Sequence, residues 1–369
     1  LMTAHMHTTA GVLAMRDWIP DRDADIVKLV RDAGYLVTGK TNTPTMALDV
    51  QCFNDLYGLT VNPYDPMLTC GGSSGGSAVA VSLGLSRFAL GSDLAGSLRL
   101  PAAFCGVCSL RPSLGALSAA GHVPPPPGLE SFAPAHLTVG PMAKSVQDLC
   151  ELWCGIQGEK QLHFQGAVQL AVCTHGIPDL PVDARIQRVM QEAFDRVLES
   201  QPSFFRSAPS QAGRDLLDRM DFPALQAAYV QLTTPFALAV SNPSKATSSG
   251  PSSSPGTAQQ KASKSVEQAV NALEDFFSAA PQECFPVLVL PVASVLPFPH
   301  DKGQKRSPIR LLVQRWNQQQ GVDVEEEDHM PYWKALIGYT SPLSILPFPI
   351  VTVPVGTTQE GLPVGVQIV

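Results

Sequence analysis

The chain of 369 residues is long enough for one large domain or two smaller ones, and its 44% hydrophobic and 15% charged residues are typical of a folded globular protein. Its formal net charge of −7 at pH 7 argues against nucleic acid as a partner, because it offers no general attraction to a phosphate backbone. No apolar run reaches the roughly 18 residues of a membrane span, so a membrane is not an expected partner either.

The eight cysteines are scattered along the chain, without the dense spacing of a small disulfide-bonded scaffold. We therefore expect a reducing, cytoplasmic compartment. Cys105 and Cys108 form a Cys-x-x-Cys pair, but no second pair follows at zinc spacing and their neighbours are apolar. Both are predicted to be buried structural thiols, and no metal site is expected.

Along the chain, the first predicted element is an amphipathic helix that opens near Pro20 and ends at Gly34. Apolar residues at helical spacing, among them Ile26 and Val30, would form its buried face. Residues 35–39 then predict a buried strand that leads into a polar loop. A helix followed by a strand begins the alternation from which an α/β sheet is built.

Two turns rich in small residues each present a serine. In the first, Ser73 lies inside the run Gly-Gly-Ser-Ser-Gly-Gly-Ser, and the apolar residues 78–83 after it predict a buried helix. In the second, Ser97 follows a strand predicted at residues 87–91, and Asp93 is expected to brace the loop. A helix after a glycine turn points unpaired N–H groups at whatever lies in front of it, which suits a developing negative charge.

Beyond the two turns the alternation of elements continues. Apolar runs predict strands at residues 168–172 and 285–290, an amphipathic helix at 182–198 and a pair of strands between 346 and 369. Residues 241–265 consist mainly of Ser, Pro, Gly and Lys without periodicity, so we interpret them as a flexible insertion and not as a domain boundary.

The order and spacing of these motifs resemble the amidase signature family. The resemblance rests on the glycine–serine run, on the 24-residue step from Ser73 to Ser97 in Asp-x-x-Gly-Ser-x-Arg, and on the continuation at residues 101–107. It implies an α/β fold with a mixed central β-sheet covered by helices on both faces. It also implies a single domain over residues 1–369, incomplete at both ends, that hydrolyses carboxylic amides through a serine acyl-enzyme without a cofactor.

The resemblance assigns a role to each small residue of the turns. Ser97 would be the nucleophile, and Ser73, next to a cis peptide bond after Gly72, would relay the proton. The oxyanion hole would consist of backbone N–H groups, and further residues would support the turns or hold the acyl group. The hole residues are Leu94, Ala95, Gly96 and Ser97, the supporting residues are Ser74, Ser92 and Arg99, and the substrate-binding candidates are Met46 and Ala47. Ala95 replaces the family's usual glycine, so its φ angle must be negative.

In the family, the general base is a lysine in a segment well upstream of the first serine turn. Counting back from Ser73 at the family's spacing places that lysine about two positions before Leu1. We therefore expect this chain to begin just after its base and to hydrolyse amides poorly as it stands. Lys40 belongs to a Gly-Lys-x-Asn segment that is a different landmark, so a structural or rim role is favoured over that of a substitute base.

Three alternatives remain open at this stage. A non-catalytic relative would keep the fold and pocket as a binding protein, and the amidase subunit of a tRNA-dependent amidotransferase would need partner subunits. A third reading takes Gly71–Gly75 as the Gly-x-Ser-x-Gly elbow of another serine hydrolase, but it requires a strand just before the turn and a later Asp and His. The expected partner is a small-molecule amide, and a homodimer is left open.

Overall fold

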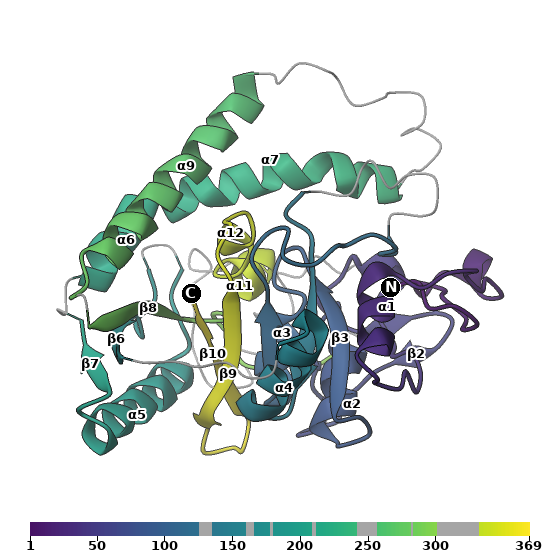
Figure 1. The fold of residues 1–369 in the computed structure, drawn as a ribbon, viewed down its shortest axis with the longest axis horizontal. Coiled ribbons are helices and arrows are strands. Elements are labelled where there is room, and N and C mark those ends of the chain that lie inside the picture. Colours follow the sequence, from purple (N-terminus) through teal and green to yellow (C-terminus); the bar gives the residue numbers. More distant parts are fainter. Residues whose placement is uncertain are drawn as a thin grey trace.

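The protein, described by a computed structural model, is organised around one mixed sheet of eight strands in the order β3-β5-β4-β9-β10-β8-β6-β7 (Figure 1). The strands are β3 (Phe88–Asp93), β4 (Cys108–Arg111), β5 (Thr138–Ala143), β6 (Ala167–Val172), β7 (Phe205–Ser207), β8 (Cys284–Pro291), β9 (Ile350–Thr357) and β10 (Pro363–Ile368). Strand β6 runs parallel to both of its neighbours, and the other pairs are antiparallel. A separate pair, β1 (Phe53–Asn54) and β2 (Gly58–Leu59), lies near the N-terminal end.

Helices cover both faces of this sheet. They are α1 (Asp25–Asp32), α2 (Gly75–Ser82), α3 (Arg99–Cys105), α4 (Val146–Gln157), α5 (Ala184–Ser200), α6 (Ala212–Met220), α7 (Phe222–Ser241), α9 (Thr257–Ser278), α11 (Tyr332–Ile337) and α12 (Ser341–Ser344), with short 3₁₀ turns at Leu13–Met15 and Thr45–Ala47. On β8, Leu288 and Leu290 pack in the core cluster of α6, α7 and α9, whereas Val289 packs in that of α5. Because successive strand residues point to opposite faces, these helices lie on opposite sides of the sheet, as expected for the α/β fold.

The structure describes residues 1–124, 135–159, 166–177, 180–208, 212–241, 257–281, 283–300 and 332–369. Over these ranges, no helix has the combination of length and apolar character that would let it cross a bilayer. The helix at the N-terminal end, the helix and strand after residue 166 and the antiparallel pair at the C-terminal end confirm the periodicity predictions.

The strand predicted at residues 35–39 is wrong. No ladder forms there, and Leu36 is 90% exposed. The ring of Tyr35 instead packs edge-on against Phe88, with 5.4 Å between the ring centroids. The segment runs along an N-terminal apolar cluster and faces the edge strand β3 across a cavity, so its backbone does not pair with that strand.

The boundary of the predicted flexible insertion also needs correction. Residues 242–256 lie outside the described residues, whereas 257–265 form the first turns of α9. Ala262 is 2% exposed and belongs to the core cluster that α9 shares with α6 and α7. Burial of this small side chain against two helices stabilises helical structure that the composition alone did not indicate.

Candidate active site

The first serine turn leads directly into α2. The Gly72–Ser73 peptide bond is cis, as the family resemblance implied, and Ser74 is the N-cap residue of the helix. A Cβ atom at Gly72 would lie 2.9 Å from the carbonyl oxygen of Asp49, so only glycine fits this close approach. Ser73 and Ser74 are both buried beneath the surrounding loops. The packing therefore fixes the position of the turn in relation to α2.

The second turn connects β3 to α3 and is braced by Asp93, which is fully buried. The Asp93 carboxylate accepts hydrogen bonds from the N–H groups of Gly96 (2.8 Å) and Leu98 (3.2 Å), and it pairs with Arg99 at 2.9 Å and 3.0 Å. Burial alone would raise the pKa of Asp93, but the charges and hydrogen bonds of Arg99, with Arg111 nearby, hold that pKa below its ordinary value. Asp93 thus stays ionised and braces the loop, as the sequence indicated.

The two turns meet at one point. The N–H of Ser74 donates to the carbonyl oxygen of Ser97 at 3.2 Å, and the N–H of Ser92 donates to Oγ of Ser74 at 3.3 Å. The Oγ of Ser74 lies 3.4 Å from the Ser92 carbonyl oxygen. Among the described residues, neither the Ser73 nor the Ser97 hydroxyl has a hydrogen-bond partner. The structure therefore brings the two turns together and leaves both hydroxyl groups without a hydrogen-bond partner among the described residues.

The backbone N–H groups of the second turn fall into two classes. That of Gly96 donates to Asp93, so Gly96 does not offer the free donor that was predicted for it. The N–H groups of Leu94, Ala95 and Ser97 donate to no other residue in the described part of the chain. Ala95 is not among the described residues with a positive φ, so alanine is accommodated without backbone strain at this position. Three of the four predicted donors thus remain unpaired.

A cavity of about 930 Å³ opens beside the first turn. Ser73, Ser74 and Ser92 line it together with Ala47, whereas Ser97 and Met46 are not among its lining residues. Met46 instead lies at φ 54° in a 3₁₀ turn, where its N–H donates to the carbonyl oxygen of Ala10. Of the two substrate-binding candidates, the structure places only Ala47 at the cavity.

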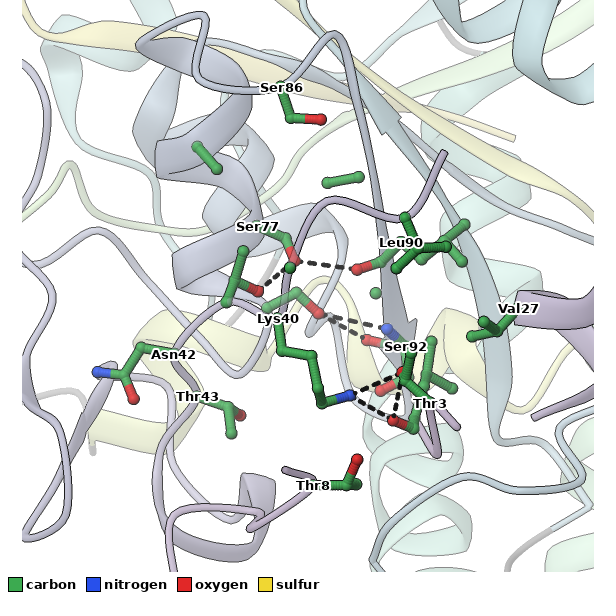
Figure 2. A pocket seen from close by; sticks show the side chains of 18 of the residues that line it. Thr3, Thr8, Val27, Lys40, Asn42, Thr43, Ser77, Ser86, Leu90 and Ser92 are labelled. Carbon is green, nitrogen blue, oxygen red and sulfur yellow. Dashed lines mark hydrogen bonds between the residues drawn. The ribbon is translucent and has the colours of Figure 1, made fainter. Parts of the chain in front are cut away.

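Lys40 extends its ammonium group into this cavity. Figure 2 shows the side chain reaching toward Thr3, whose Oγ1 lies 3.1 Å from Nζ, and Nζ also donates to the carbonyl oxygen of Leu1. Burial lowers the pKa of Lys40 to about 8, although the charge of Asp23 opposes the shift. No described hydrogen bond joins Nζ to a serine of either turn. These contacts favour a structural role for Lys40 in the wall of the cavity over that of a substitute base.

His122 is a site residue that the sequence analysis did not single out. Its Nε2 lies 2.8 Å from Oγ of Ser92, and Nδ1 lies 2.5 Å from the carbonyl oxygen of Pro124. Because a carbonyl can only accept, Nδ1 carries the proton and Nε2 accepts from the serine hydroxyl. Burial lowers the pKa of His122 to about 3, so the ring stays neutral. Its place in the site depends on how the loop that contains His122 folds against Ser92 of β3, which the sequence does not indicate.

The Cys-x-x-Cys pair lies in the core, as predicted. Cys105 and Cys108 are both buried, and burial raises the pKa of Cys108 to about 11. A thiol with so high a pKa stays protonated at neutral pH. Within the described ranges, no group of three or more His, Cys, Asp or Glu side chains is arranged to hold a metal ion.

The N-terminal half of the chain is similar in sequence to proteins of known family. Residues 1–172 match the family model described as Amidase. The chain is 40% identical over 213 residues to a glutamyl-tRNA(Gln) amidotransferase subunit of Methanospirillum hungatei JF-1, in an alignment that covers 54% of this chain and 48% of that protein. It is 32% identical over 219 residues to the corresponding subunit of Methanococcoides burtonii, covering 55% of this chain and 45% of that protein. The matched region thus spans about half the length of these relatives.

Solved structures extend the likeness over the whole chain. The structure of 6-aminohexanoate cyclic dimer hydrolase with its substrate superimposes with a TM-score of 0.70 at 23% identity, covering all of this chain and 78% of that one. A crystal structure of an amidase gives a TM-score of 0.65 at 26% identity, covering 99% of this chain and 77% of that one. Residues 1–172, which contain both serine turns, thus match the amidase family model, and the fold of the whole chain agrees with that of the solved amidase structures.

Proposed function

We propose that this protein hydrolyses the C–N bond of a small-molecule carboxylic amide, with Ser97 as the nucleophile and Ser73 as the proton relay. The observation that carries the proposal is the contact between the two turns, where Ser74 N–H meets the Ser97 carbonyl and both hydroxyl groups stay unpaired. A nucleophile must be reachable by substrate and free to give up its proton. The unpaired state of both hydroxyl groups supports the proposal.

In the proposed reaction, Ser97 Oγ attacks the carbonyl carbon and its proton passes through Ser73 to a general base, which the family resemblance gives as a lysine upstream of the first serine turn. The negative charge that develops on the carbonyl oxygen is stabilised by the unpaired N–H groups of Leu94, Ala95 and Ser97. The C–N bond then breaks, the nitrogen takes up a proton, and ammonia or an amine leaves. Water next attacks the acyl ester of Ser97, which releases the acid and restores the hydroxyl group.

A fluorophosphonate probe tests the assignment of the nucleophile. The probe should modify the protein at Ser97, and Ser97→Ala should abolish the labelling, together with the hydrolysis of aryl and primary amides that the chain shows, which is expected to be slow. Ser86→Ala is the matched control, because Ser86 also lines the cavity but its hydroxyl is bound to the Phe88 carbonyl outside both turns. Labelling that persists in Ser97→Ala would overturn the assignment.

A second candidate is the amidase subunit of a tRNA-dependent amidotransferase, which would use the same chemistry to release ammonia from an amide. The relatives named as glutamyl-tRNA(Gln) amidotransferase subunits, with 40% and 32% identity, favour it. Release of ammonia from glutamine, measured with and without candidate partner subunits, separates this role from that of an independent amidase. A protein that binds amides but is not labelled at Ser97 would instead be the non-catalytic relative.

We also propose a cytoplasmic location and keep a homodimer as the assembly to be tested. All eight cysteines are free, and all except Cys150 are buried, which fits a compartment where thiols stay reduced. Size-exclusion chromatography with light scattering measures the assembly directly.

A further inference from the structure

One peptide unit of the second turn is held at both ends. The Ala95 carbonyl oxygen accepts a hydrogen bond from Oγ1 of Thr340, and the Gly96 N–H of the same peptide unit donates to Asp93 at 2.8 Å. A peptide unit is planar, so fixing its oxygen and its N–H sets the orientation of the whole group. The peptide between Ala95 and Gly96 therefore cannot rotate without breaking a buried hydrogen bond.

Side-chain packing also restricts the peptide unit between Ala95 and Gly96. Gly96 has φ +124°, and a Cβ atom there would lie 2.3 Å from Oγ1 of Thr340. Thr340 itself is fully buried, so it cannot move aside into solvent. Its hydroxyl also lies 3.4 Å from the Ile337 carbonyl, but the Ala95 carbonyl is the closer acceptor. Gly96 and Thr340 therefore pack closely against one another although they are far apart in the sequence.

Thr340 is itself linked to the buried charged residues next to the second serine turn. It is the N-cap residue of α12, and its carbonyl oxygen accepts from Oγ of Ser344 at 2.8 Å. Ser344 contacts two buried guanidinium groups, because Arg99 donates to its Oγ and Arg111 donates to its carbonyl oxygen. Arg99 also pairs with Asp93, the acceptor of the Gly96 N–H. Both ends of the peptide unit are thus tied into one hydrogen-bonded network.

We infer that Thr340 is a positioning residue for the oxyanion hole. This inference rests on the proposed amidase function, since it assigns the hole to the N–H groups that flank the clamped peptide. The N–H groups of Ala95 and Ser97 belong to the neighbouring peptide units, and they are unpaired in the described structure. Holding the peptide between them fixes the directions in which they point. Preorganised donors of this kind stabilise the transition state more than the bound substrate.

The test compares Thr340→Val, which removes the hydroxyl with little change in volume, with Thr340→Ser, which keeps it. We expect Thr340→Val to lower kcat by about 10- to 100-fold with little change in KM, because small misplacements of catalytic groups cost that much. Inhibition by a trifluoromethyl ketone, whose serine adduct carries an oxyanion, should weaken in parallel with kcat. Thr340→Ser should restore both. Equal kcat and inhibition in the wild type and Thr340→Val would overturn the inference.

A second measurement does not depend on activity. Hydrogen–deuterium exchange of the Gly96 amide should quicken in Thr340→Val and stay slow in Thr340→Ser, because the clamp on the peptide is released only in the former. Unchanged exchange in Thr340→Val would contradict the clamp whatever the kinetics show. The two proposals can fail separately. If the proposed function is wrong, the wild-type protein will not be labelled at Ser97, but the Gly96 amide will still exchange slowly in wild type and faster in Thr340→Val.

Discussion

Asp93 shows how one carboxylate can serve both the geometry of a site and the stability of a core. It is fully buried, and two fully buried guanidinium groups, Arg99 and Arg111, lie close enough to lower its pKa. The same carboxylate orients the backbone of the second turn through Gly96 and Leu98. Because the cluster is shielded from water, each charge depends on the others for compensation. The geometry of the second serine turn and the charge balance of the core therefore depend on the same side chain.

The variant Asp93→Asn tests this dependence, since asparagine keeps the shape of the side chain but removes its charge. We expect the free energy of unfolding at pH 7 to fall by about 3–5 kcal/mol, because two buried arginines lose their counter-charge. Urea denaturation followed by circular dichroism measures it. Asp32→Asn, in the exposed Lys28–Asp32 pair, is the control and should change stability little. Equal midpoints for the two variants would contradict this account.

The pH dependence of Asp93 has a definite sign. Since its pKa is lower in the folded protein than in the unfolded chain, the carboxylate stabilises the fold fully above its ordinary pKa, near 4. That contribution is lost as the pH falls through the lowered value. The stability difference between wild type and Asp93→Asn should therefore be largest near neutral pH and shrink in acid, in the same denaturation series.

Among the elements, α9 illustrates how tertiary contacts decide where a helix begins. Its first turns contain polar residues, yet Ala262 is buried in the cluster with α6 and α7. Figure 1 shows α9 beside α6 and the near end of α7, at an angle to α7. The small side chain allows this close packing, which is why the helix extends into a stretch whose composition predicted flexibility.

Ala262→Asp should lower the free energy of unfolding by about 2–3 kcal/mol, because it places a charge in the helix interface with no partner. The neighbouring Ser263 is exposed, so Ser263→Asp is the matched control and should leave stability nearly unchanged. Thermal unfolding of the two variants measures the difference. If both variants have the melting temperature of the wild type, the start of α9 does not contribute to the core.

Sequence reasoning was most successful where local signals agreed. The two serine turns, the helix after the first and the strand before the second follow from glycine patterns and apolar periodicity. The prediction failed at residues 35–39, whose composition favours a strand, because a cavity lies between these residues and the edge strand β3. Sequence reasoning also could not predict the role of Thr340 or His122, since nothing near either residue in the sequence indicates which loop will fold against it.

At the scale of the molecule, the site is divided between distant parts of the chain. The two turns lie within the 1–172 match to the family model, but Arg99 of that segment is bound by Ser344 and by Gln367, whose Oε1 lies 3.0 Å from Nη1. Strand β4 of the same segment pairs with β9. The matched segment therefore contains the catalytic candidates but not the residues that enclose them.

A fragment of residues 1–172 should consequently fail to fold as an independent unit. Without β9, β10 and α12, it would expose an edge strand, and Arg99 and Arg111 would lose their acceptors on Ser344 and Gln367 while Asp93 remains. We expect weak near-UV circular dichroism and no cooperative urea transition, in contrast to the full chain. A cooperative transition with the midpoint of the full chain would show that the first half is self-sufficient.

The pairing of Arg99 with Gln367 spans 268 residues, and this separation matters during synthesis on the ribosome. The chain leaves the ribosome from its N-terminal end, so both serine turns emerge long before Ser344 and Gln367, two of the acceptors of Arg99, and the hydroxyl of Thr340. Contacts of such long sequence range slow folding and leave partly folded chains open to aggregation. The two serine turns should therefore stay without their complete set of contacts until Gln367 has left the ribosome.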